Sequence, residues 1–210
     1  MIAYFLKYYD RLFLALLEHV EIVLFTLVIS ILLASVITIL IYRNETLGNL
    51  IVQIFGAVYS IPSLALFALL IPITGLGEKT AILVLVLYNQ FLLIRNFLAG
   101  LENVNPSIVE AAYGMGMSNI QVLTKIQIPL AAPLIIAGIR LSTISTIGIA
   151  TIAATINAGG LGNLLFDGMR TMNTYKILWG TIFCAVIAFL ADDALKRIED
   201  FIQKKVGVKK

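Results

Sequence analysis

The chain has 210 residues, of which 60% are hydrophobic and 13% are charged, and its mean hydropathy is +0.99. Ordinary soluble domains carry about 25% charged residues, so this composition excludes a soluble globular protein and indicates a chain solvated mainly by lipid. The net charge of +3 is small. It requires no nucleic acid partner, because the basic excess lies in a C-terminal tail that would sit beside anionic membrane lipid.

The first 19 residues mix charged side chains with aromatic residues and leucines. This differs from the uninterrupted apolar core of a signal peptide. The pattern predicts an N-terminal amphipathic helix over residues 1–19 that lies in the membrane interface. A lead-in that continues into the first membrane span is an equal alternative.

Five apolar runs follow, and each predicts a membrane-spanning helix, because about 20 apolar residues cross roughly 30 Å of hydrocarbon. The third and fifth runs are short, so their helices are extended to residues 79–97 and 175–192. Leucine and isoleucine continue without alternation along each run, which favours helices. The predicted fold class is all-α: a single multi-pass membrane domain over residues 1–210. The runs cover residues 20–42, 51–71, 81–94, 130–154 and 177–191.

The distribution of Lys and Arg predicts the orientation, since cytoplasmic loops carry the excess of these residues. With the C-terminus inside, nine of the fifteen basic residues are cytoplasmic and five are external, while Arg140 lies within a span. The N-terminus is then outside. The cytoplasmic set is Arg43, Arg95, Lys125, Lys196, Arg197, Lys204, Lys205, Lys209 and Lys210; the external set is Lys7, Arg11, Lys79, Arg170 and Lys176.

The segment at about 98–128 is predicted to be a cytoplasmic loop that contains two short helices. Asn105 followed by Pro106 predicts the start of a helix over 106–113, which Gly114 and Gly116 would end. Ser118 and Gln121 match a capping box that would start a second helix over 119–128, ending before Pro129. The small residues Ala111 and Ala112 would let another surface approach the first helix closely.

Enzyme motifs are missing from the sequence. The string GLGEKT at 75–80 lacks the glycine that precedes lysine in a phosphate-binding loop. His19 is the only histidine, which excludes a His-based metal cluster or a Ser-His-Asp triad. The pair Asp192-Asp193 is expected where the last span meets water, with an amphipathic tail after it. The chain is therefore predicted to be non-catalytic and to bind no metal or cofactor.

Polar residues within the apolar runs are candidates for lining a translocation path. Close helix packing is an equal explanation for the small and hydroxyl residues of the fourth span. Arg140 favours function, because a charge within a span costs about 2.5 to 3.5 kcal/mol and normally faces protein or water. Pro62 is expected to kink the second span. The segment at 157–176 is expected to be a surface loop, with a dip toward a pore mouth as the alternative. The candidates are Tyr59, Ser60, Pro62, Asn89, Arg140, Ser142, Ser145 and Thr146.

The string EAAYGMGMSNIQVLTKIQIP at 110–129 resembles the signature of ABC importer membrane subunits: Glu-Ala-Ala, Gly four residues on, then Ile-x-Leu-Pro. The matching residues are Glu110, Ala111, Ala112, Gly116, Ile126 and Pro129, and Ile128 replaces leucine. The stretches YSIPSLALFALLIPITGLG, LIRNFLAGLENV and ATIAATINAGGLGNLLFDG are similar to one branch, the permeases for glycine betaine, carnitine and choline.

The resemblance implies a permease subunit whose signature loop couples it to separate ATPases. It further implies that ATP and Mg²⁺ bind to the ATPases, that a second permease completes the path, and that a separate external protein captures the solute. An amino acid such as methionine is the runner-up substrate. A self-sufficient channel or carrier is the alternative from another class, but Arg140 alone provides no charged relay.

Overall fold

The computed structural model describes residues 1–206, and within this range it contains helices and turns without a β-strand. Four helices in the described range are long and apolar enough to cross a membrane, and a bent helix pair makes five if it counts as one span. The predicted all-α membrane fold is therefore confirmed. Lys209 and Lys210, which were expected in the cytoplasmic tail, lie outside the described residues.

The first helix, α1, runs from Ile2 to Ile41 and has one break, at Tyr8, where φ is −128° and ψ is 20°. Its buried residues begin at Leu12, which is 1% exposed. The predicted boundary at residue 19 is therefore wrong. The break separates only the residues before Tyr8 from the long helix. From Leu12 onward the helix packs on the bundle, since Leu12, Ala15 and His19 recur at helical spacing on its buried face.

The second apolar run forms two helices, α2 (Glu45–Tyr59) and α3 (Ser63–Thr74), which meet at an angle of 94°. Asn44 caps α2 by accepting a hydrogen bond from the Leu47 backbone N–H at 3.0 Å. Pro62 cannot donate a backbone hydrogen bond, so the helix stops before it and restarts at Ser63. The predicted kink is confirmed, and it is a complete break.

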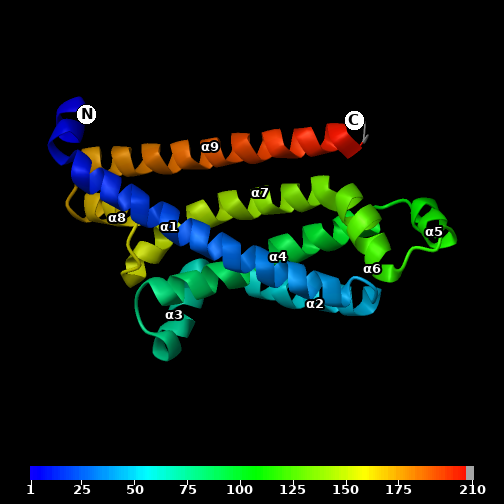
Figure 1. Cartoon of the computed structure of the whole chain (residues 1–210). Coiled ribbons are helices and arrows are strands. Elements are labelled where there is room, and N and C mark those ends of the chain that lie inside the picture. Colours follow the sequence, from blue (N-terminus) through cyan, green and yellow to red (C-terminus); the bar gives the residue numbers. More distant parts are fainter. Residues whose placement is uncertain (207–210) are drawn as a thin grey trace.

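The centre of the bundle is made by α1, α4 (Glu78–Glu102) and α7 (Ile128–Ile152), with α9 beyond α7 (Figure 1). We call the contact between α4 and α7 the seam. A Cβ placed on Gly138 of α7 would lie 2.6 Å from Cβ of Asn96, and one on Gly100 of α4 would lie 3.1 Å from the Ala131 carbonyl oxygen. Small residues thus bring the two helix backbones close together.

The loop between α4 and α7 contains α5 (Pro106–Gly114), α6 (Asn119–Val122) and a π-helical turn over Leu123–Gln127. The first predicted helix and the capping box are confirmed. The prediction that the second helix ends before Pro129 is wrong, because the chain stays helical from Asn119 to Ile156. The π turn directly precedes Pro129. In it the Ile128 N–H bonds to the Leu123 carbonyl, five residues back, and this wider turn lets the helix continue through the proline.

After α7 come a 3₁₀ turn (Ala153–Ile156), α8 (Leu161–Arg170) and the long helix α9 (Thr174–Val206). The segment expected as a surface loop is thus mainly a short helix that packs against α9. The helix continues through Asp192 and Asp193 into the expected tail, since α9 runs to Val206. The N-terminus and α8 lie at one end of the bundle, whereas α5 and the last turns of α9 lie at the other (Figure 1).

Candidate functional site

Residues 106–122, which we call the elbow, project from one end of the bundle (Figure 1). Local hydrogen bonds shape this segment. The Asn105 side chain accepts from the Ser107 N–H at 2.9 Å and starts α5. Gly116 has φ of +79°, a left-handed conformation that glycine adopts at little cost, and it turns the chain after α5. The Gln121 side chain then accepts from the Ser118 N–H at 2.8 Å, which completes the capping box.

The elbow presents apolar side chains away from the bundle. Met115 is 75% exposed and Ile120 is 74% exposed. Glu110, Ala111 and Gly116 are exposed beside them. Ala112 was expected to be accessible to a partner, but it is 1% exposed and belongs to the buried side of α5. Within the described chain nothing covers Met115 and Ile120, so this surface is suited to a partner protein.

The other two signature residues, Ile126 and Pro129, do not lie in the elbow. They are in the π turn and the first turn of α7. There they line a groove together with Ile108 of α5 and Ile202 of α9. The structure therefore divides the signature between a projecting surface and a groove at its base.

Three path candidates form a buried network between α1, α4 and α7. The Asn89 side chain, 2% exposed, donates to Ser30 Oγ at 3.2 Å and accepts from Thr146 Oγ1 at 3.0 Å. Thr146 also lies 2.7 Å from the Ser142 carbonyl oxygen, and Ser142 is fully buried. In this chain Asn89 and Thr146 join helices, which is the packing role that hydroxyl and amide side chains often have in membranes, whereas the Ser142 hydroxyl has no hydrogen-bond partner among the described residues. Ser145 is half-buried on the same helix.

Tyr59, Ser60 and Pro62 lie together at the break between α2 and α3. Ser60 and Pro62 are exposed, and Tyr59 packs edge-on against Tyr88 with the ring centres 5.6 Å apart. The Tyr88 hydroxyl donates to the Ile61 carbonyl oxygen at 2.6 Å. Tyr88 was not among the residues predicted from the sequence. It supplies a partner to a backbone group that the broken helix leaves free.

Arg140 is not with the other path candidates, since it pairs with two carboxylates of α9. Its guanidinium contacts Asp192, and Nη1 lies 3.3 Å from Glu199 Oε2. Asp192 and Glu199 are two helical turns apart and thus share one face of α9. That spacing was a signal in the sequence for a basic partner. From the sequence, Asp192 was expected only at the end of a span. Glu102 and Glu110 were the carboxylates considered as ion-pair partners for Arg140.

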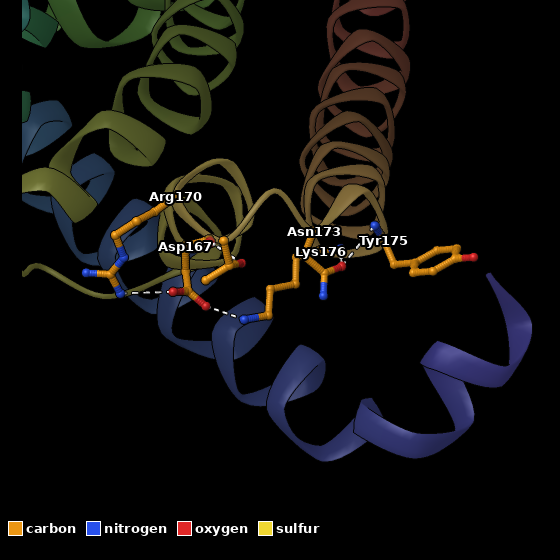
Figure 2. Close-up of polar contacts among 6 residues, drawn as sticks. Asp167, Arg170, Asn173, Tyr175 and Lys176 are labelled. Atoms are coloured by element: carbon orange, nitrogen blue, oxygen red, sulfur yellow. Dashed lines mark hydrogen bonds and ion pairs between the residues drawn. The ribbon is translucent and has the colours of Figure 1, made fainter.

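At the opposite end, Asp167 of α8 accepts hydrogen bonds from both Lys176 and Arg170 (Figure 2). The hydrogen bond from Lys176, and then that from Arg170, lowers the pKa of the Asp167 carboxyl below its ordinary value of 3.8. Asn173 accepts from the Tyr175 N–H at 3.1 Å and caps α9. These contacts hold α8 against the start of α9. Among the described residues, no group of three His, Cys, Asp or Glu side chains could hold a metal ion.

Comparisons with known proteins agree with this geometry. Residues 23–208 match the model of a family described as binding-protein-dependent transport system inner membrane component. The chain is 34% identical to the carnitine transport permease protein OpuCB of Listeria monocytogenes, covering 87% of this chain and 84% of that protein. It is also 34% identical to the choline transport system permease protein OpuBB of Bacillus subtilis, covering 85% and 82% respectively.

Among solved structures, the fold is similar to that of an inward-facing MetNI methionine ABC transporter chain. The TM-score is 0.83, with 91% of this chain and 95% of that chain covered. Sequence identity is 20%, so this likeness concerns the fold alone.

Proposed function

Because the chain belongs to the family of binding-protein-dependent transport system inner membrane components, we propose that it is the permease subunit of an ATP-driven importer for quaternary ammonium solutes such as glycine betaine, carnitine or choline. The observation that carries the proposal is the elbow, where Glu110, Ala111 and Gly116 are exposed on a capped, projecting segment. Relatives whose names specify carnitine and choline favour this solute class over methionine.

The elbow would seat a separate cytoplasmic ATPase. Met115 and Ile120 offer an apolar anchor, and the exposed Glu110 of the same segment, which forms no ion pair among the described residues, would pair with a basic group. ATP and Mg²⁺ would bind to that ATPase, because the chain's sequence contains no phosphate-binding loop. Closure of the ATPases would move the elbow as a rigid body and change which end of the path is open.

A second permease subunit would complete the translocation path. The exposed break at Ser60 and Pro62 is a candidate for the surface that the two subunits share. Arg140, held by Asp192, would fix α9 to α7 while the path changes shape. The excess of Lys and Arg at the elbow end supports an external N-terminus and a cytoplasmic elbow. A separate external protein would deliver the solute.

Two measurements test the proposal: co-purification of the ATPase and solute uptake by reconstituted vesicles. Glu110→Ala with Gly116→Val should lower ATPase recovery about tenfold, as the loss of an interface hot spot does. Glu45→Ala changes an exposed glutamate on α2 and should leave recovery unchanged. Competition among glycine betaine, carnitine and choline then identifies the solute. Concentration of solute by vesicles that hold this chain alone would contradict the proposal.

A further inference from the structure

An open groove of about 590 Å³ lies at the base of the elbow, where three segments of the chain meet. Ile108 contributes from α5, Pro129 and Leu130 from the start of α7, and Ile202 from the last turns of α9. These side chains give the groove an apolar floor. Both α7 and α9 are candidate membrane spans, so the groove lies where spanning helices reach the end of the bundle.

Two lysines, Lys125 and Lys205, lie at the edge of this floor. They come from different elements, the π turn and α9. Both are exposed, and within residues 1–206 neither forms an ion pair. Among the described residues, no carboxylate lines the groove. The groove thus combines an apolar floor with two positive charges that have no counter-charge among its lining residues.

We propose that this groove binds an anionic phospholipid, with an acyl chain on the apolar floor and the phosphate between Lys125 and Lys205. A phospholipid has the same division into apolar chain and negative headgroup, and basic residues at a membrane surface attract such headgroups. A protein surface that buried both lysines would have to supply carboxylates for them, since an unpaired buried charge is costly. The proposal does not depend on the solute or on the ATPase.

The site would connect the elbow to the membrane-spanning helices. A lipid in the groove contacts Ile108 of α5 on one side and Ile202 of α9 on the other, two segments distant in the sequence. It also contacts Ile126 and Pro129. This accounts for signature residues that lie outside the projecting surface of the elbow: they would form the lipid-facing support of the segment that the ATPase contacts.

Native mass spectrometry of the full-length chain, with any subunits that co-purify, tests the site. The delipidated protein is offered equimolar phosphatidylglycerol and phosphatidylcholine. Each lysine near an anionic lipid contributes about fivefold in affinity, so the first bound lipid should be phosphatidylglycerol by about 25-fold. Lys125→Gln with Lys205→Gln should remove most of this preference. Lys204→Gln changes an exposed lysine outside the groove and should retain it.

A second variant separates the groove from a general surface charge effect. Ala132 lines the groove, so Ala132→Phe should fill it and displace the lipid while both lysines remain. Elution volume and circular dichroism establish that each variant is folded. The proposal is overturned if the double-lysine variant keeps the wild-type preference, or if Lys204→Gln loses as much. It is also overturned if a photoreactive benzoylphenylalanine placed at Ile202, which inserts into neighbouring C–H bonds on illumination, cross-links to a partner subunit instead of to lipid.

Discussion

The seam between α4 and α7 and the elbow beyond it both depend on glycine, for opposite physical reasons. At the seam, Gly138 leaves no room for a side chain, since an added Cβ would lie 2.6 Å from Asn96 Cβ. In the elbow, an added Cβ on Gly116 would meet nothing within 4 Å, but φ is +79°. The first glycine allows two helices to approach, and the second allows the backbone to turn.

The two glycines thus mark a tightly packed part of the chain and an exposed part of the chain. The seam lies among buried residues such as Leu93 and Ile94, both 0% exposed. The elbow has its own helix caps and exposes Met115 and Ile120. Changes at the seam should therefore alter the stability of the whole bundle. Changes in the elbow should stay local.

The largest effect is expected from Gly138→Ala. The new methyl group would press on Asn96 Cβ, which cannot rotate away, so α4 and α7 must separate. Overpacking of this kind costs about 2 to 3 kcal/mol. Denaturant unfolding of the purified protein in detergent measures the loss.

Gly148→Ala is the matched control, because it lies on the same helix and an added Cβ would meet nothing within 4 Å. Alanine is the better helix former by about 1 kcal/mol in soluble hosts, so this variant should be neutral or slightly stabilising. If Gly138→Ala and Gly148→Ala lowered the free energy of unfolding equally, the distinction between the close-packed seam and the open position of Gly148 would be contradicted.

A smaller loss is expected from Arg140→Met, which separates α7 from α9 without disturbing the seam. Methionine keeps the aliphatic stem but leaves Asp192 and Glu199 without their cation; these side chains are 32% and 17% exposed. Partial burial places the cost between that of surface and buried pairs, at about 2 kcal/mol. Arg197→Met removes the ion pair with Asp193, whose partners are 78% and 44% exposed, so water screens the pair and the loss should be much smaller than for Arg140→Met. Similar unfolding curves for the two variants would show that Arg140 is only a surface charge.

The elbow could be predicted in detail because its signals are local. Asn105, Pro106, Ser118 and Gln121 act within three residues along the chain, and their caps are confirmed. The apolar runs likewise predicted the membrane helices, since length and hydropathy are properties of a single segment. Local signals did not show that a π turn would carry the helix through Pro129.

Pairings between distant segments could not be predicted. Arg140 and Asp192 are 52 residues apart in the chain, and Asn89 and Ser30 are 59 apart. A polar residue in a span has the same sequence signature whether it lines a path or joins two helices. Burial decides between these roles, and for Asn89 at 2% exposure it favours the joining of helices within this chain.

A loss of about 1 kcal/mol is expected from Asn89→Leu, which keeps the side-chain volume near that of the amide and removes its two cross-helix hydrogen bonds. Such bonds average about 0.6 kcal/mol each in membrane proteins. The cost stays small because Ser30 Oγ still donates to the Thr26 carbonyl oxygen at 2.7 Å and Thr146 to that of Ser142. Asn49→Leu, at an exposed position on α2, is the control for added hydrophobicity. If solute uptake falls while unfolding is unchanged, Asn89 lines the path instead of joining helices.

The smallest effect on global stability is expected from Ser118→Ala, which removes the capping box of the elbow. Loss of an N-cap costs about 1 kcal/mol in the helix that it caps. The bundle can keep its packing while α6 frays, because the capped turn is exposed at Ser118 and Gln121. Hydrogen exchange should therefore be faster by about fivefold at the amides of Gln121 and Val122, which bond to Ser118, with α4 and α7 unchanged. The control is Ser107→Ala. Ser107 is exposed in α5 and has no side-chain hydrogen bond in the described structure, so this variant should leave exchange in α6 unchanged.

A different outcome would be that Ser118→Ala lowers the unfolding free energy as much as Gly138→Ala does. The elbow and the seam would then form one cooperative unit, and a force applied to the elbow would reach the seam without a hinge between them.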